Sequence, residues 1–205
     1  MGSSKDPADK RKAISTLEEV LKKVENDKAT RGEAISRLVE LYSDQSDWPN
    51  TEKYARLYLA ENNSKKAPEV SYFFALSFDK RNMTDDALAN YAQVGSRYTG
   101  YLRVSAPSMK RVLEIMWKRN YPIGKTVGAG KSKITLEKSD RQTAYEEIGS
   151  RYVAQTSKIR KTNSDVSDEE KQMWDEVAAL VKRYEKSGEV KTLDQIKAEA
   201  GKRTR

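Results

Sequence analysis

The sequence predicts an all-α fold of stacked helix pairs, and three observations support this prediction. Apolar residues recur three and four positions apart along most of the 205 residues, which is the spacing of one face of an α-helix. Only 5 prolines and 10 glycines are present, so long helices are allowed. The string from Tyr91 to Tyr98 recurs in similar form from Tyr145 to Tyr152. Repeated helical units therefore account for most of the chain.

Six helices are expected before residue 120, each with a recognisable start or stop signal. Proline is favoured at the first position of a helix, and threonine is favoured just before it. The four-residue break at 47–50 separates the second helix from the third. The expected landmarks are Asp6-Pro7 for the first start, 62–64 for the third stop, Pro68 for the fourth start, Thr84 as the fifth cap, and Val104–Arg119 for the sixth helix.

A glycine- and lysine-rich stretch then separates these helices from those that follow. Capping-box patterns mark the later starts at Ser139 with Gln142 and at Ser167 with Glu170, and a short last helix is expected from Thr192, with Gln195 three residues on. The expected organisation is an added or irregular start at 1–5, helical repeats at 6–119, a basic inserted loop at 120–138 and C-terminal helical repeats with a cap at 139–203.

The repeated helices share a pattern of apolar positions. One helix of a pair carries Met109, Val112, Leu113 and Met116, and the same spacing appears as Phe74-Ala75-x2-Phe78 and as Trp174-x2-Val177-Ala178-x2-Val181. The partner helix carries Ala87, Tyr91 and Val94. These patterns resemble the tetratricopeptide repeat (TPR) family, whose helices have the forms W-x2-L-G-x2-Y and A-x3-F.

The resemblance implies a right-handed solenoid of antiparallel helix pairs, with about nine helices in all. Val39 and Leu113 are bulky where the family has glycine or alanine, so the repeats are degenerate. An irregular helical bundle is the alternative. In the family such a solenoid binds a protein or peptide in its concave groove, and similar second helices occur in bacterial envelope proteins. The resemblance thus favours a bacterial periplasmic or envelope location, with a leader or anchor removed before Lys5.

The composition excludes several kinds of chemistry. The chain has no histidine and no cysteine, so it cannot form a Ser-His-Asp or Cys-His nucleophile, a His- or Cys-ligated zinc site or a disulfide. The sequence has no run of 18 apolar residues, so it predicts no membrane-spanning helix. The stretch Gly124–Ser132 has a lysine where a phosphate-binding loop needs its first glycine, and no strand is predicted before it. We therefore expect no enzyme activity, no cofactor and no metal.

Positive charge is concentrated between residues 101 and 135. This stretch has eight basic residues and a single acidic residue, Glu114, which makes a net charge of +7. Such a patch attracts acidic proteins, nucleic acid or anionic lipid. A solvated helix face is the alternative. The candidate anion patch consists of Arg103, Arg111, Arg119, Lys125, Lys131 and Lys133.

The TPR resemblance also implies which side chains line a partner-binding groove. The family's groove positions fall on Tyr72, Lys110, Trp117 and Lys118. Tyr72 and Trp117 are the candidate anchors, because aromatic side chains dominate binding energy at interfaces. Packing of both rings into the core is the alternative. The leading expectation is thus a scaffold that binds a protein or peptide, and the second is an anion-binding module built on the basic helix 103–119 and loop 120–138.

Overall fold

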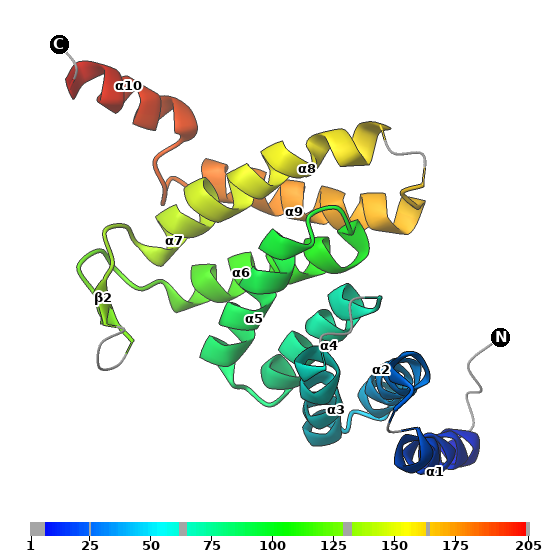
Figure 1. Cartoon of the computed structure of the whole chain (residues 1–205). Coiled ribbons are helices and arrows are strands. Elements are labelled where there is room, and N and C mark those ends of the chain that lie inside the picture. The colour runs from blue at the N-terminus through cyan, green and yellow to red at the C-terminus, as the bar shows by residue number, and fades with distance from the viewer. Residues whose placement is uncertain (1–6, 25, 62–64, 129–132, 163–164, 204–205) are drawn as a thin grey trace. The chain divides into compact units, whose positions relative to one another are not determined.

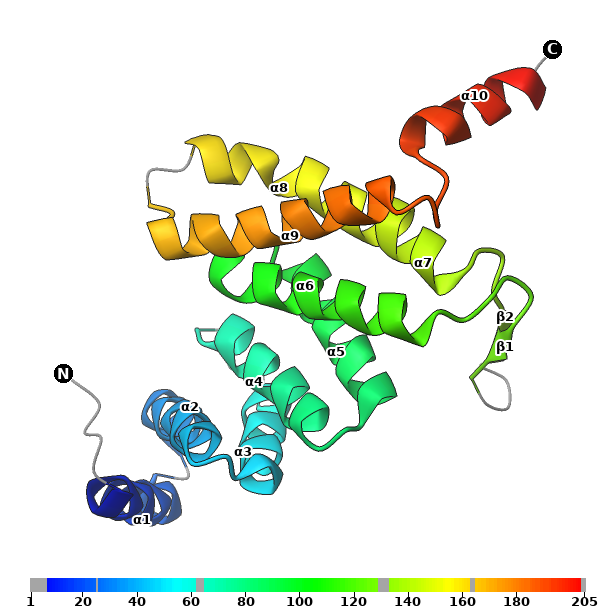
Figure 2. The ribbon, with the colours of Figure 1, turned by 180° about the vertical axis from the view of Figure 1, so that it is seen from behind.

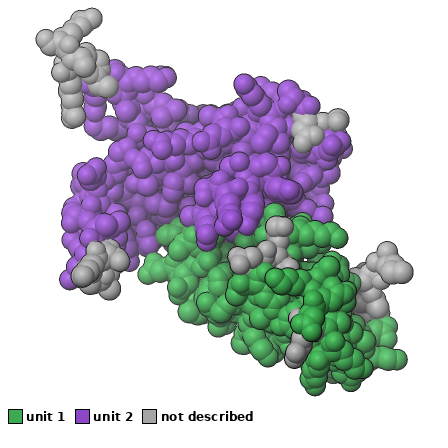
Figure 3. All heavy atoms as spheres, in the orientation of Figure 1, with its two compact units in different colours: residues 1–90 green, residues 91–205 purple. Residues whose placement is uncertain are grey.

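The chain is helical throughout nearly all of the part that the structure describes. A computed structural model describes residues 7–24, 26–61, 65–128, 133–162 and 165–203 (Figure 1). The all-α prediction is confirmed for these residues. The chain divides into two compact units, residues 1–90 and 91–205, which Figure 3 colours separately. The division falls inside helix α5 (Thr84–Arg97), so each unit is described by itself.

The first unit contains four complete helices. They are α1 (Pro7–Lys23), α2 (Lys28–Asp44), α3 (Trp48–Ala60) and α4 (Ala67–Lys80). Helix α2 packs against α1, α3 and α4, and α3 also packs against α4. The apolar residues Ile35, Leu38, Val39 and Tyr42 of α2, which are three and four positions apart, are all buried. The core of this unit is therefore formed by the faces that the apolar spacing indicates.

A carboxylate ties three helices of the first unit together. The hydroxyls of Tyr42 and Tyr54 both donate to Glu18 Oε1, at 2.8 and 2.7 Å, and the two rings stack with centroids 5.4 Å apart. These two hydrogen bonds lower the pKa of Glu18, because they stabilise its ionised form. Burial and the same carboxylate raise the pKa of Tyr54 to about 12.

The second unit is built on α6 and the helices that follow it. These are α6 (Leu102–Arg119), the strands β1 (Thr126–Val127) and β2 (Ile134–Thr135), α7 (Asp140–Gln142), the π-helical segment η2 (Thr143–Gly149), α8 (Ser150–Thr162), α9 (Asp168–Lys186) and α10 (Leu193–Arg203). Helix α6 packs against α7, η2 and α9, and α9 also packs against η2 and α8. Figures 1 and 2 show α10 pointing away from α9 in both views.

Polar contacts lock the aromatic side chains of this second core. Trp174 Nε1 donates to Thr156 Oγ1 at 2.6 Å, and the hydroxyl of Tyr184 donates to the carbonyl of Leu113 at 3.2 Å. The hydroxyls of Ser105 and Tyr152 lie 2.9 Å apart. Each buried aromatic group thus has a hydrogen-bond partner, as burial requires.

The capping patterns at Ser167 and Thr192 are confirmed. The pattern at Ser139 is formed only in part, because the Gln142 side chain bonds to the Lys191 backbone instead. Ser167 and Glu170 form a complete capping box at α9, and Ser139 Oγ accepts from the Gln142 amide. Thr192 and Gln195 bond reciprocally at the start of α10. Thr84, by contrast, is the first helical residue of α5 rather than its cap.

Two local features differ from the sequence expectation. The stretch 120–138 contains a small antiparallel hairpin, in which Thr126 pairs with Thr135 and Val127 with Ile134. Strands of two residues are too short to produce a detectable alternation. The second copy of the repeated string enters a π-helix at 143–149, whereas the first copy stays α-helical in α5.

Candidate binding site

Charge is divided very unequally between the two units. Residues 91–205 carry 24 Lys and Arg against 15 Asp and Glu, a formal net charge of +9, whereas residues 1–90 carry 15 against 16, a net charge of −1. A surface of this sign raises the local concentration of acidic partners. The second unit is therefore the better candidate for a site that binds an acidic partner.

Two basic residues of α6 that the sequence singles out are paired with carboxylates. Lys110 Nζ donates to Glu176 Oε2 at 2.7 Å, and this hydrogen bond raises the pKa of Lys110. Arg111 Nη1 donates to the same-helix Glu114 at 3.3 Å. Both pairs are half-exposed, so they add little stability, but they reduce the positive potential of this helix face.

Arg119 belongs to a structural clamp rather than to an open patch. Its guanidinium donates two hydrogen bonds to the Asp140 carboxylate, at 2.7 and 3.1 Å. The Tyr121 amide donates to the same carboxylate at 3.1 Å. Asp140 is 2% exposed, so its charge is compensated almost entirely by this contact with Arg119.

Trp117 has both faces of its ring covered. The Tyr184 ring stacks on one side with the centroids 3.6 Å apart, and the Arg141 guanidinium lies 5.1 Å from the ring centroid. Tyr184 itself is 3% exposed. The ring of Trp117 thus serves mainly to join α6 to α9, and only its edge is left for a partner.

Tyr72 is also largely enclosed. It lies in the first unit, half-buried on α4, with its ring 5.9 Å from that of Phe73 in an edge-on arrangement. Burial, followed by the charge of Asp79, raises the pKa of its hydroxyl. Tyr72 belongs to the first unit and Trp117 to the second, so each ring is described within its own unit.

The remaining basic residues of the predicted sites lie at the surface. Arg103, Lys118, Lys125 and Lys133 are all exposed, and Lys125 Nζ lies 5.6 Å from the centre of the Tyr121 ring. Lys131 lies outside the described residues. The predicted anion patch is therefore split into members held in ion pairs and exposed members, which lie at the start of α6 and in the hairpin.

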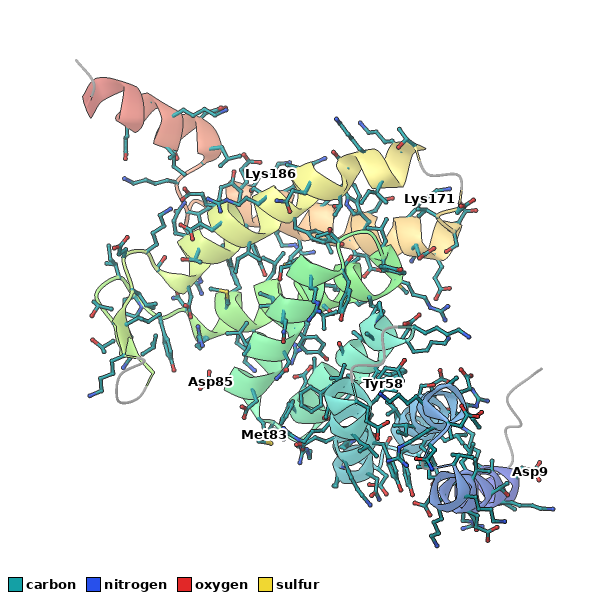
Figure 4. All side chains as sticks on the ribbon, in the orientation of Figure 1. Asp9, Tyr58, Met83, Asp85, Lys171 and Lys186 are labelled. Carbon is teal, nitrogen blue, oxygen red and sulfur yellow. The ribbon has the colours of Figure 1, made fainter. Side chains whose placement is uncertain are left out.

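A further basic surface lies on α9, where the sequence analysis named no site. We call Ala179, Lys182, Arg183 and Lys186 the outer face of α9. They line a shallow depression together with Ser187, and Lys186 is labelled in Figure 4. The depression arises because a small alanine stands among three long side chains. On the opposite side of the helix, Val177, Leu180, Val181 and Tyr184 are buried.

The carboxylates near this outer face already have partners. Asp175 pairs with Arg160 and Glu176 with Lys110, while Glu185 accepts from the Tyr145 hydroxyl and Glu189 pairs with Arg141. Among the described residues, no carboxylate lies within ion-pair distance of Lys182, Arg183 or Lys186. Their spacing of one and four residues on a polar helix face could have identified them in the sequence.

The described residues contain no cluster of acidic or other ligating side chains that could hold a metal ion. None of the described helices combines the length and the apolar character needed to cross a bilayer. Comparisons of the chain with protein-family models, with curated proteins and with solved structures gave no match. Function must therefore be argued from the surfaces themselves.

Proposed function

We propose that this chain is a non-enzymatic TPR-like scaffold that binds an acidic segment of a partner protein on the outer face of α9. The observation that carries this proposal is a set of three cations around Ala179 for which the described residues supply no carboxylate partner. Cations without local partners can neutralise an incoming carboxylate without breaking an existing ion pair. An acidic peptide is thus the partner that this face suits best.

The packing within each unit supports a TPR-like solenoid. In such a solenoid each helix packs against the next helix and against the next but one. In the first unit α2 packs against both α3 and α4. In the second unit α6 packs against both η2 and α9. Contacts of Lys110 with Glu176 and of Trp117 with Tyr184 show that α6 and α9 run in the same direction, as the first helices of successive repeats do.

The absence of histidine and cysteine from the sequence supports a binding role over catalysis. The TPR family's groove positions 2, 5, 9, 12 and 13, applied to α9 through its match at Trp174, fall on Gln172, Asp175, Ala179, Lys182 and Arg183. Three of these residues line the depression. The proposed site therefore coincides with part of the surface that TPR-like proteins present to peptides.

Charge reversal at the outer face of α9 tests the proposal. We expect Lys182→Glu with Lys186→Glu to weaken binding of a fluorescein-labelled acidic peptide, rich in aspartate and containing one tyrosine, by ~10-fold or more, since two attractive contacts become repulsive. The matched control is Lys158→Glu with Lys161→Glu, which alters the net charge equally at exposed positions of α8. Fluorescence anisotropy at 0.15 M salt measures both. Equal weakening in the two variants would mean that net charge alone governs binding, and the site would be wrong.

A second candidate function is the binding of a polyanion to the positive surface of the second unit as a whole. The net charge of +9 on residues 91–205 favours it. Its basic helix and loop keep Arg103, Lys118, Lys125 and Lys133 exposed. This candidate predicts steep dependence on salt rather than on any one pair of lysines.

A further inference from the structure

The hairpin between α6 and α7 leaves apolar side chains exposed. It projects beyond the adjoining ends of α6 and α7 in both ribbon views (Figures 1 and 2). Ile123 is 69% exposed and Ile134 is 60% exposed, the highest values among the described isoleucines and leucines. Exposure of large aliphatic side chains to water is unfavourable in free energy. A partner surface that covered these side chains would remove that unfavourable contribution.

The pairing of the strands sets the face of the ribbon on which Ile134 lies. Val127 is paired with Ile134, so their side chains share one face of the ribbon, while Thr126 and Thr135 share the other. The hydroxyls of the two threonines lie 3.3 Å apart. The hairpin thus has one aliphatic face and one hydroxyl face. A two-stranded ribbon is marginally stable alone, so its aliphatic face gains from being covered.

Lysines accompany the exposed isoleucines, and carboxylates do not. Lys125 lies two residues after Ile123, and Lys133 lies directly before Ile134; both lysines are exposed. The sequence contains no acidic residue from Ile115 to Leu136. Aliphatic side chains next to cations, without carboxylates, are complementary to a surface with negatively charged groups on the outside and a hydrophobic layer below them.

The base of the hairpin is held firmly. Gly124 N donates to the Leu136 carbonyl at 2.8 Å, and Leu136 N donates to the Lys125 carbonyl at 2.9 Å. The Asp140 carboxylate, bound to Arg119 and to the Tyr121 amide, fixes the point at which the hairpin leaves α6. The exposed isoleucines are therefore presented from a fixed base.

We propose that the described part of this hairpin, residues 123–127 and 133–135, docks the protein on a membrane surface that carries anionic headgroups. Ile123 and Ile134 enter the interface, and Lys125 and Lys133 contact the phosphates. A stable protein interface needs roughly 800 Å² on each partner and aromatic anchors in pockets, which a ribbon of two-residue strands does not offer. Single-stranded nucleic acid binds through stacked aromatics, whereas Tyr121 already lies beneath Arg119 and Lys125. A bilayer needs no complementary pocket.

This docking is independent of the partner site on α9, and vesicle sedimentation tests it. The full chain is mixed with sucrose-loaded vesicles of phosphatidylcholine with 30% phosphatidylglycerol, and with vesicles of phosphatidylcholine alone. We expect binding to the anionic vesicles only. Lys125→Glu with Lys133→Glu should lower the partition coefficient at least tenfold, since each lysine near an anionic surface contributes roughly fivefold. Ile123→Asn with Ile134→Asn should also lower it several-fold.

Matched controls separate insertion from general attraction. Tyr101→Asn removes an apolar group that is also 60% exposed but lies outside the hairpin, and we expect it to leave partitioning unchanged. Lys182→Glu with Lys186→Glu changes the net charge as the lysine variant of the hairpin does. In the variant Ile134→Trp, the fluorescence of the new tryptophan should be quenched by brominated lipid if the hairpin enters the bilayer. Circular dichroism checks that each variant is folded.

Three results would overturn the proposal. One is equal partitioning of the parent and the asparagine variant. Another is an equal loss with the α9 charge reversal. The third is binding of polyglutamate, but not of vesicles, that depends on the hairpin isoleucines, which would assign the hairpin to an acidic protein. Loss of vesicle binding in hairpin variants that still bind the acidic peptide through α9 would support it and separate the two sites.

Discussion

Asp140 and Glu18 each hold together side chains from separate parts of the chain. Asp140 is buried and joins Arg119 and the Tyr121 amide, 21 and 19 positions earlier. The sequence marks Asp140 only as a favourable acid in the first turn of a helix. Its pairing depends on how the stretch 120–138 returns to α6, which the spacing of residues along the chain does not determine. Local signals therefore identified the helix start but not the ion pair.

Removing the Asp140 carboxylate should destabilise the second unit. Asp140→Ala leaves Arg119 and the Tyr121 amide without their acceptor, and we expect a loss of about 2 kcal/mol or more in the free energy of unfolding. Asp175→Ala is the control, because Asp175 pairs with Arg160 at a half-exposed site and should cost less than about 1 kcal/mol. Urea denaturation followed by circular dichroism measures both. Similar losses in the two variants would show that burial does not set the value of the Asp140 contact.

Acid should weaken the first unit partly through Glu18. Hydrogen bonds from Tyr54 and Tyr42 lower the pKa of Glu18 below the ordinary value of 4.5. The stabilisation is therefore fully present above that value and is lost as the pH falls through the pKa of the folded state. Glu18→Gln still accepts hydrogen bonds but does not titrate, so its unfolding free energy should fall less between pH 5 and pH 3 than that of the parent.

The control for this pH dependence is Glu19→Gln, which changes a neighbouring carboxylate that is exposed. Urea melts at several pH values give the slope for each variant. A slope in Glu18→Gln that matches the parent would contradict the assigned role of the two tyrosine hydroxyls.

At the scale of the elements, capping and apolar spacing were good guides, and the exact helix type was not. The boxes at Ser167 and Thr192 depend on residues three positions apart, so they could be identified from sequence. The two copies of the repeated string are nearly alike, yet only the second enters a π-helix. Nothing in the string itself accounts for that difference, and so the surrounding packing must decide it.

The glycines of the two strings should differ in their tolerance of a methyl group. A Cβ on Gly149 would stand 2.6 Å from Val181 Cγ2 and 3.0 Å from the carbonyl oxygen of Ala144, neither of which can move freely. A Cβ on Gly95 would stand 2.6 Å from the terminal methyl of Met109, which is flexible. We expect Gly149→Ala to cost roughly 1–3 kcal/mol. Gly95→Ala should be close to neutral, since alanine gains about 1 kcal/mol in helix propensity.

Thermal and urea unfolding of the two variants measure this difference, with the parent as reference. Equal destabilisation would contradict the close approach of Gly149 to α9. A larger loss in Gly95→Ala would contradict the flexible adjustment of Met109.

At the scale of the whole molecule, the sequence predicted where positive charge gathers but not which cations stay available. The sequence placed Lys110 in a candidate groove and Arg119 in a candidate anion patch, whereas carboxylates 66 and 21 positions later pair with them. Such partners are brought close only by the packing of α9 and α7 against α6. Lys182 and Lys186 lie outside the predicted region, and no carboxylate in the described part of the chain forms an ion pair with either of them. The positive surfaces of the second unit therefore differ in part from those that the sequence predicted.

The charge division between the units predicts how the chain meets a polyanion. Binding of a short DNA duplex should be weak, blind to base sequence and steeply reduced between 0.05 and 0.2 M salt, because counterion release supplies most of its free energy. Lys158→Glu with Lys161→Glu should lower both the affinity and the salt slope. Lys12→Glu with Lys65→Glu should change them little, since the first unit carries no positive excess that could attract the duplex. Fluorescence anisotropy with two unrelated duplexes measures this, and equal effects of the two reversals would contradict it. Tight binding of one duplex that survives ~0.3 M salt, where exposed charges are strongly screened, would instead make nucleic acid the first candidate partner.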